Sequence, residues 1–310
     1  MPRYLLTRLI VLVTQAFLVL TLVFVLFRLA PGDPAKLILG PTATPDQVDR
    51  LREQLGLDQP VLSQYGHYLG DIVAGNFGRS TSYSQPVLQV ISGHLAATLV
   101  LLATSLAIAV TIGVAAGIFS AIRPRSVFSK GTLLVWVALL AVPNFWLGML
   151  LIQLFAAKLH WLPAIGATGA AGVVLPAIAV AARLVALIAR LTRASMLETL
   201  GEDFVRTATA RGVSPARLIF LHALKPAAPA ILTMIGMQAG YLLGGAVVVE
   251  NLFSYPGMGQ LLLSAVSQRD YPLMQGITAM FVLGFLLINL VVDLLCTRID
   301  PRTRPLAGAR

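Results

Sequence analysis

Long, nearly uncharged apolar runs alternate with short polar segments along the whole of this chain. Five of the runs are clear, and a sixth, at 173–193, is interrupted by Arg183 and Arg190. A helix of about 20 apolar residues crosses roughly 30 Å of hydrocarbon, and each run is that long. The pattern therefore predicts an all-α integral membrane protein whose six transmembrane helices lie near residues 9–28, 95–122, 131–157, 173–193, 229–249 and 275–296.

The basic residues decide between five and six spans. With five spans, Arg298 and the C-terminal tail would lie on the opposite side of the membrane from Arg3 and Arg8. With six, 15 of the 23 lysines and arginines fall on one side, 7 on the other, and Arg183 lies within the membrane. Cytoplasmic loops carry the excess of Lys and Arg, so six spans with both termini in the cytoplasm are predicted.

Composition agrees with a membrane protein: 57% of the residues are apolar and 12% are charged, against about a quarter charged in soluble domains. The first run exceeds the ~7–15 residues of a signal-peptide core, and Arg28 occupies the place of a small-residue cleavage site, so a retained span is expected. The net charge of +10 is clustered between the spans, which argues against nucleic-acid binding. One cysteine, Cys296, excludes an intrachain disulfide.

The first outer loop is expected to contain two amphipathic helices. Thr44, Pro45 and Gln47 form a capping-box start, and Gly56 is a plausible stop. A second helix is expected from Pro60 to Gly75, with one apolar side formed by Leu62, Tyr65, Leu69 and Ile72. Two interpretations stay open: the helices cap the outer mouth, or they form a contact surface for a soluble delivery protein.

Small residues and prolines predict how the spans pack. Gly113 and Gly117 lie four apart in the second span, and Gly236, Gly240 and Gly244 do so in the fifth. Such spacing allows transmembrane helices to approach closely. Pro143 should kink the third span.

A polar, basic, helix-forming segment separates the fourth and fifth spans. Its first helix would run from Glu202 to Ala210 and break at Gly212, and Ser214 and Pro215 suit a new helix start. On periodicity alone, an interfacial amphipathic helix with snorkelling arginines is an equal alternative to a docking element for a soluble partner.

The residues themselves resemble a known family. EDFVRTATARG at 202–212 and HALKPAAP at 222–229 resemble the cytoplasmic coupling loop of ATP-binding-cassette (ABC) importer permeases, in their dipeptide, oligopeptide, glutathione and nickel branch. The resemblance covers almost the whole chain. It continues through LAPGDPA at 29–35, LGLDQPVLSQYGHYL at 55–69, GNFGRS at 75–80, LPAIAVAARLVALIARLTRASMLE at 175–198, GGAVVVENLFSYPGMGQLL at 244–262, RDYPLMQG at 269–276 and INLVVDLLCTRIDPR at 288–302.

The resemblance implies a type I importer permease of the bacterial inner membrane. It implies a first span plus extracytoplasmic loop at 1–93, a five-helix core at 94–296 with a coupling loop at about 197–228, and a cytoplasmic tail at 297–310. The coupling loop would dock on a cytoplasmic ATPase through Glu202, Asp203, Arg206, Thr207, Ala208, Arg211 and Gly212. The family's general motif begins Glu-Ala-Ala, whereas Arg206, Thr207 and Ala208 stand here. Lys225 and Pro226 replace the branch's usual Arg-Asn.

The implied partners are a second homologous permease chain, one or two P-loop ATPase subunits, an extracytoplasmic binding protein and membrane lipid. The chain contains no G-x-x-x-x-G-K-[ST] motif, so it is expected to bind no cofactor and to hydrolyse no ATP itself. ATP and Mg would be used by the partner ATPases. Di- or oligopeptides, including glutathione-like peptides, are the expected cargo, with nickel complexes and opines as alternatives.

Ionisable and polar residues within the spans are candidates for the translocation pathway. Arg183 either snorkels or pairs with a neighbouring carbonyl, or it lines the path and meets a peptide carboxylate or carbonyl. Asn289 and Asp293 lie one turn apart in the last span, where Asp293 could instead pair with a basic residue. Gln238 is a weaker candidate, and Glu250 could contact a substrate amine near the outer gate.

Two other classes fit less well. An ion-coupled secondary transporter usually has several paired charges in mid-membrane and inverted repeats, whereas this chain has one clear mid-span charge. An intramembrane enzyme would need a catalytic constellation. The four histidines, His67, His94, His160 and His222, are scattered, without metalloprotease spacing.

Overall fold

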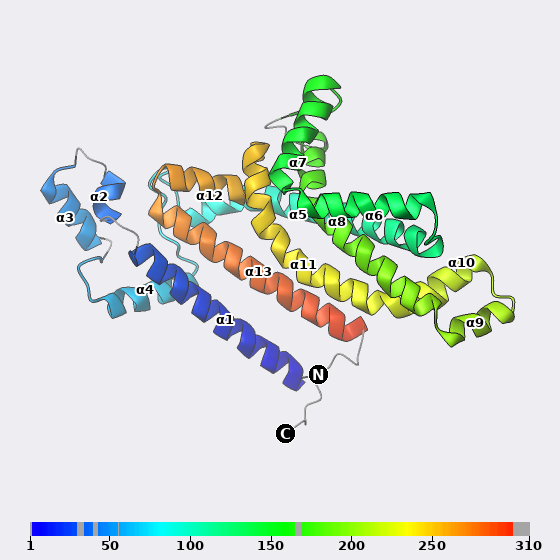
Figure 1. Ribbon diagram of the computed structural model, residues 1–310. Helices are drawn as coiled ribbons and strands as arrows, with labels where there is room; N and C mark the ends of the chain where they lie inside the picture. Colours follow the sequence, from blue (N-terminus) through cyan, green and yellow to red (C-terminus); the bar gives the residue numbers. More distant parts are fainter. Residues whose placement is uncertain (1, 30–33, 40–42, 55, 165–168, 300–310) are drawn as a thin grey trace. The chain divides into compact units, whose positions relative to one another are not determined.

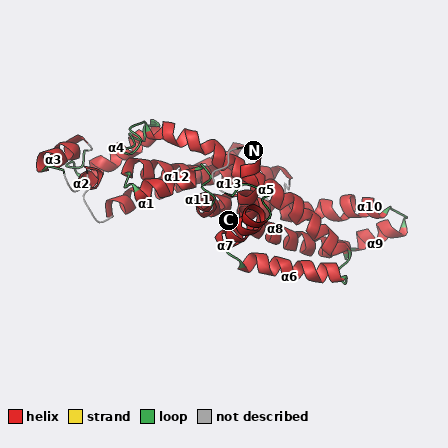
Figure 2. Cartoon of the chain, turned by 90° about the horizontal axis from the view of Figure 1, so that it is seen from above, coloured by secondary structure: helices red, strands yellow, loops and turns green. Residues whose placement is uncertain are grey.

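The computed structural model describes residues 2–29, 34–39, 43–54, 56–164 and 169–299. Helices make up almost all of this part of the chain (Figure 2), and its one pairing of extended backbone is the isolated bridge between Arg79 and Pro86. Two compact units form: Met1–Thr98 with Pro256–Leu286, and Leu99–Tyr255 with Leu287–Arg310. The division at 93 and 296 drawn from the sequence stays a prediction.

The first unit combines the N-terminal third of the chain with the segment Pro256–Leu286. Its core contains Val87, Val90 and Ile91 of α5, packed against α12 and the start of α13. A Cβ at Gly276 of α13 would lie 2.5 Å from Cγ1 of Val87, so the lack of a side chain there allows this close approach. The helices of this unit are α1 (Pro2–Leu29), α2 (Pro34–Leu39), α3 (Pro45–Gln54), α4 (Val61–Val73), the first turns of α5 (Val87–Ile122), α12 (Met258–Ser267) and the first part of α13 (Tyr271–Ile299) (Figure 1).

Both predicted helices of the outer loop are present. At the start of α3, the Thr44 N–H donates to the Gln47 side-chain oxygen at 3.0 Å, as a capping box requires. Gly56 follows α3 with a φ of 65°. On α4, Tyr65 contacts α1 through a hydroxyl bond to Thr21 and through the ring of Phe24. Leu62 departs from the predicted apolar side, because its side chain is 81% exposed.

Asp270 joins two segments that lie far apart in the sequence. Its carboxylate accepts hydrogen bonds from the Ser80 hydroxyl at 2.5 Å, the Ser82 N–H at 3.0 Å and the Leu273 N–H at 3.2 Å. The last of these caps the start of α13. Burial disfavours the charge, but these bonds and one from the Thr81 backbone outweigh it and hold the pKa of Asp270 below its usual value. The carboxylate therefore ties the outer loop to α13.

The second unit is built around α8. Most side chains of this helix are buried, including those of Leu184, Ile188 and Ala189. The helices of the unit are the rest of α5, α6 (Val127–Ala141), α7 (Asn144–Leu151), η1 (Ile152–Lys158), α8 (Ala170–Leu200), α9 (Asp203–Ala210), α10 (Pro215–Arg217), η2 (Leu218–Leu224), α11 (Lys225–Leu252) and the end of α13.

Glycines set the closest contacts in this unit. A Cβ at Gly113 would lie 2.9 Å from Ile188, and one at Gly117 would lie 2.5 Å from the Cβ of Thr192, so α5 packs directly on α8. Gly236 of α11 lies similarly close to Val292 of α13. Gly244 faces open space instead. The prediction of close packing is confirmed for Gly113, Gly117 and Gly236, but Gly244 makes no such contact, so the glycines of the fifth span do not form one continuous packing surface.

Pro143 breaks the third span more sharply than a kink. α6 ends at Ala141, Val142 and Pro143 are extended, and α7 begins at Asn144. Proline lacks an N–H and clashes with the preceding turn of a helix, which explains the break. The two halves, Ser129–Ala141 and Asn144–Lys158, are bent by 109°.

The described residues contain five helices that are long and apolar enough to cross a membrane, or six when the bent pair counts as one span. The predicted spans are thus confirmed in number, with changed bounds. The second begins at Val87 rather than 95. The doubtful fourth, Ala170–Leu200, is the most buried of all. The fifth continues without interruption from Pro215 to Leu252, so the second helix of the cytoplasmic segment and the span are one element.

Candidate functional site: a polar cleft and a cytoplasmic helical segment

A cleft of about 440 Å³ lies beside Arg183, in the middle of α8. Arg183 is exposed, while Ala182 and Leu184 on either side of it are buried. A charged side chain in mid-span costs about 2.5–3.5 kcal/mol if it faces lipid, so its position in a cleft is significant. The cleft is lined by Asn144, Val180, Arg183, Leu184, Met237, Gln238, Tyr241, Leu242 and Gly245.

The polar groups of the cleft come from three helices. Asn144 is the first residue of α7, so the break at Pro143 determines its position. Gln238 and Tyr241 are three residues apart on α11 and therefore share a face. Among the described residues that line the cleft there is no carboxylate, so its formal charge is positive. A guanidinium, two amides and a phenol can together bind a carboxylate and adjacent amide groups.

The other predicted pathway residues lie elsewhere. Glu250 is fully buried near the end of α11, and its backbone carbonyl accepts from the Tyr255 N–H at 2.8 Å. Burial, followed by the charge of Glu250, raises the pKa of Tyr255. Asn289 is half-buried in α13 and does not line the cleft. The side chain of Asp293 lies outside the described residues.

Asn144 and Tyr241 were missed by sequence reasoning. Tyr241 could have been found from its spacing to Gln238, but no local signal marks Asn144 as polar lining.

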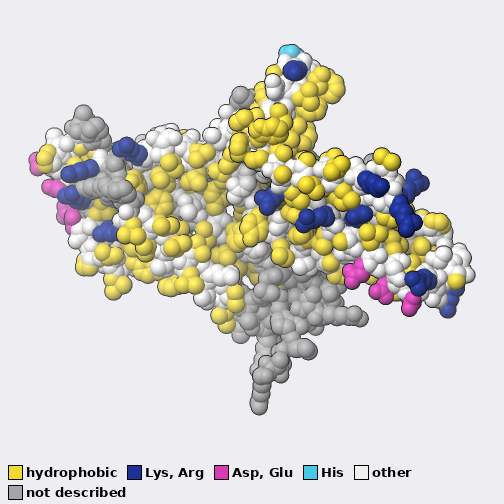
Figure 3. All heavy atoms as spheres, viewed as in Figure 1, with side chains coloured by type: hydrophobic (Ala, Val, Ile, Leu, Met, Phe, Trp, Pro, Cys, Tyr) yellow, Lys and Arg dark blue, Asp and Glu magenta, His cyan; other side chains and the backbone are white. Residues whose placement is uncertain are grey.

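The segment between α8 and α11 begins with a short helix, α9, and a turn, as predicted, but the predicted second short helix is not separate, because it continues from Pro215 through η2 into α11. Val205 and Ala208 are the buried positions of α9, and they anchor it. Glu202, Asp203, Arg206, Thr207 and Arg211 are exposed, and Arg206 pairs with Asp203 at 3.4 Å. Gly212 has a φ of 77°, a backbone conformation that side chains resist, and Ser214 precedes Pro215 at the next helix start. Charged and apolar side chains are mixed on this end of the unit (Figure 3).

The exit from this segment is a continuous helix. Leu218–Leu224 is wound as a π-helix and leads directly into α11. Pro226 would clash with a carbonyl in a regular α-helix, and the wider π turn just before it relieves that clash. The segment also exposes large apolar groups: Phe204 is 46% exposed, Phe220 57% and Leu221 53%. Exposed aromatic groups among charges are typical of a contact surface.

Two family models match, in order, along nearly the whole chain. The N-terminal model of the binding-protein-dependent transport system membrane component matches residues 1–103. The model of the binding-protein-dependent transport system inner membrane component matches residues 113–305. The chain belongs to this family of permeases.

Curated relatives match the permease over its full length. The glutathione transport system permease protein GsiC of Escherichia coli K12 is 43% identical over 304 residues, covering 98% of this chain and 99% of the relative. The GsiC protein of Shigella dysenteriae serotype 1 matches equally well.

Solved structures share the fold. The MetNI methionine ABC transporter in inward-facing conformations matches with a TM-score of 0.58 at 16% identity, over 69% of this chain and 97% of the other. An amino acid ABC transporter with histidines matches with a TM-score of 0.52 at 18% identity, over 68% and 94%.

The fold and the family agree on the class of the protein. The permease is a multi-pass ABC importer subunit of the bacterial inner membrane, and such a subunit works with partner ATPase and permease subunits. The type I fold expected from the coupling-loop resemblance is confirmed. Within the part of the chain that the structure describes, no group of three or more His, Cys, Asp or Glu could hold a metal ion.

Proposed function

We propose that this permease imports short peptides, including glutathione-like tripeptides, and that separate ATPase subunits drive it. The observation that carries the proposal is the Arg183 cleft, a positively charged cavity lined by two amides and placed in the middle of an apolar span. The near full-length similarity to permeases named for glutathione supports the same cargo class.

The chemistry of the cleft suits a peptide. Every unmodified peptide ends in a carboxylate, and a guanidinium binds a carboxylate through two parallel hydrogen bonds. The amides of Asn144 and Gln238 can both donate and accept, which matches peptide groups next to the carboxylate. The ring of Tyr241 supplies an apolar surface for a side chain.

Coupling would use the continuous helix Pro215–Leu252. The exposed part of α9 and the turn at Gly212 would dock on an ATPase through Glu202, Asp203, Arg206, Thr207, Arg211 and Gly212, while the buried Ala208 would hold the helix in place. Because Gln238 and Tyr241 lie on the helix that begins beside this turn, a displacement of the docked segment would move the wall of the cleft that α11 forms. Helices are stiff enough to carry such a movement as a rigid element.

The remaining components would be supplied in trans. A second homologous permease chain would complete the path, one or two ATPases would bind ATP and Mg, and an extracytoplasmic protein would deliver the peptide. This chain would bind no cofactor and carry out no hydrolysis.

Uptake by the reconstituted complex tests the cleft. We compare Arg183→Gln with Arg190→Gln, which removes an exposed arginine from the same helix. The substrates are Ala-Ala and its C-terminal amide. A charge-assisted bond is worth about 1.5–3 kcal/mol, so Arg183→Gln should raise the KM for Ala-Ala by at least about tenfold. It should barely change the KM for the amide.

Equal effects on both peptides, or normal uptake by Arg183→Gln, would contradict the assignment of Arg183 to the carboxylate. Uptake of a nickel complex or an opine in place of any peptide would contradict the cargo class.

A further inference from the structure

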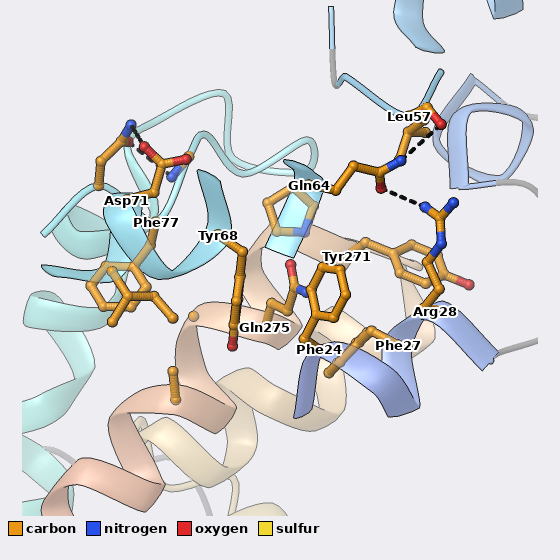
Figure 4. A pocket seen from close by; sticks show the side chains of 16 residues that line it. Phe24, Phe27, Arg28, Leu57, Gln64, Tyr68, Asp71, Phe77, Tyr271 and Gln275 are labelled. Carbon is orange, nitrogen blue, oxygen red and sulfur yellow. Dashed lines mark hydrogen bonds between the residues drawn. The ribbon is translucent and has the colours of Figure 1, made fainter. Parts of the chain in front are cut away.

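A second cavity, of about 300 Å³, lies within the first unit (Figure 4). We call it the outer pocket. It lies at the end of α1 opposite the cytoplasmic N-terminus and hence on the extracytoplasmic side. Its lining comes from α1, α4, the segment after α4 and the start of α13, and consists of Phe24, Phe27, Arg28, Leu57, Gln64, Tyr68, Asp71, Ile72, Asn76, Phe77, Gly78, Tyr271, Pro272, Gln275, Gly276 and Ala279.

Aromatic rings form the walls of the outer pocket. The ring centroids of Phe24 and Tyr68 are 5.4 Å apart, and those of Phe27 and Tyr271 are 6.3 Å apart. These pairs link α1 to α4 and α1 to α13, so the walls are fixed by packing between helices. Rings held in this way offer a rigid apolar surface at little entropic cost.

Opposite charges lie at the two ends of the outer pocket. Figure 4 shows Arg28 at one end and Asp71 at the other, with the aromatic rings and Gln275 between them. Arg28 donates to the Gln64 side-chain oxygen at 2.5 Å, and Asp71 accepts from the Asn76 side chain at 3.2 Å. Each bond positions its charged group. A guanidinium has five donors and a carboxylate about four acceptor sites, so each can also bind a ligand.

The middle of the outer pocket contains polar groups suited to a ligand. The Tyr68 hydroxyl is buried and has no hydrogen-bond partner among the described residues. Burial, followed by the proximity of Tyr65, raises the pKa of Tyr68 to about 12, so the hydroxyl keeps its proton and can donate it. The amide of Gln275 points into the cavity (Figure 4). Buried polar groups in native proteins are nearly always paired, so an unpaired hydroxyl in a cavity indicates a polar ligand.

We infer that the outer pocket receives a short zwitterionic peptide before it reaches the Arg183 cleft. The peptide's ammonium would meet Asp71, its carboxylate Arg28, and a peptide carbonyl the Tyr68 hydroxyl. This inference rests on the proposed function, since it assigns a first binding site to the same peptide. A lipid acyl chain fits the pocket less well, because it would leave the Tyr68 hydroxyl and the Gln275 amide unpaired.

The test uses the whole complex in nanodiscs, without the binding protein, and a dipeptide that carries photo-leucine. After irradiation, mass spectrometry locates the label. Attachment within 24–28, 64–78 or 271–279 is expected, and Tyr68→Phe should reduce it about two- to tenfold. The matched control is Tyr65→Phe, which removes a hydroxyl from the same helix outside the outer pocket. It should label like the wild type.

End-modified peptides test the two charges as competitors of the label. Asp71→Asn should weaken competition by Ala-Ala about two- to fivefold and leave competition by N-acetyl-Ala-Ala unchanged. Arg28→Gln should weaken competition by Ala-Ala to a similar extent and leave competition by Ala-Ala-amide unchanged. Labelling confined to the Arg183 cleft would overturn the inference and leave the proposed function standing. Labelling of the outer pocket that phosphatidylethanolamine suppresses and Ala-Ala does not would assign the pocket to lipid and also overturn it. If the complex takes up no peptide at all, the proposed function fails first.

Discussion

The carboxylate of Asp270 should control the stability of the outer loop. It is fully buried and accepts from the Ser80 hydroxyl and from the backbone N–H groups of Ser82 and Leu273. A helix cap is worth about 1 kcal/mol, and each bond to a charged group about 1.5–3 kcal/mol. Taking the low values, Asp270→Ala should cost about 3–4 kcal/mol. Asp270→Asn keeps one acceptor oxygen and should cost about 1–2 kcal/mol.

Hydrogen exchange measured by mass spectrometry reports this loss of stability segment by segment. Because each 1.36 kcal/mol is a factor of ten, amides at 79–86 and at the start of α13 should exchange roughly 100- to 1,000-fold faster in Asp270→Ala. In Asp270→Asn they should exchange roughly 5- to 30-fold faster. Asp58→Asn, at an exposed carboxylate of the same loop, is the control and should change nothing. Exchange within about twofold of wild type in Asp270→Ala would refute the reasoning.

The pH dependence follows from the same bonds. The folded pKa of Asp270 lies below the ordinary aspartate value of 3.8, so the stabilising effect of the carboxylate is complete above that value and is lost as the pH falls through the folded pKa. Protection of the loop, corrected for intrinsic exchange, should therefore hold from neutral pH down to about pH 4 and decline below it. Asp270→Asn should show no such decline.

Two further substitutions test the packing of the second unit and the coupling turn. Gly117→Ala should place a methyl group against Thr192 and the Ala189 carbonyl oxygen and lower the Tm of the purified permease by an amount equivalent to about 1–3 kcal/mol. The control is Gly131→Ala, whose methyl group meets open space. Equal Tm values for the two variants would contradict the close packing. In Gly212→Val, a valine side chain at a φ of 77° should cost about 1–2 kcal/mol, and peptide uptake should fall severalfold. The Gly212→Asn variant should transport nearly normally, because Asn tolerates this conformation. Equal uptake by the two variants would show that the turn geometry does not matter.

Local patterns in the sequence were sufficient to predict the spans, the outer-loop helices and the first helix of the cytoplasmic segment, but not the continuity of its second helix with the fifth span. Each depends on residues within a few turns of one another, such as the capping pair Thr44 and Gln47. The same holds for the turn at Gly212. Periodicity was less informative for α8, where Arg183 and Arg190 lowered the apparent apolar character of the most buried span. Those arginines are exposed on one face of that helix.

Contacts between distant segments could not be predicted in this way. Ser80 and Asp270 are 190 residues apart, and the family-like segments that contain them give no sign that they meet. The position of Asn144 in the cleft depends on the 109° bend at Pro143, and proline chemistry predicts a break without fixing its angle. The assignment of Glu250 and Asn289 to the pathway rested on position along a span. Neither of them lines the cleft that holds Arg183 and Gln238.

The central claim is that ATP hydrolysis on partner subunits drives a peptide through this permease. The most direct test reconstitutes the complex in proteoliposomes with its binding protein and measures accumulation of labelled Ala-Ala or glutathione. The account predicts accumulation against a gradient that requires ATP hydrolysis and falls at least about tenfold, at peptide concentrations well below KM, in Arg183→Gln. Accumulation driven by an ion gradient without ATP, or uptake that is indifferent to Arg183, would contradict it.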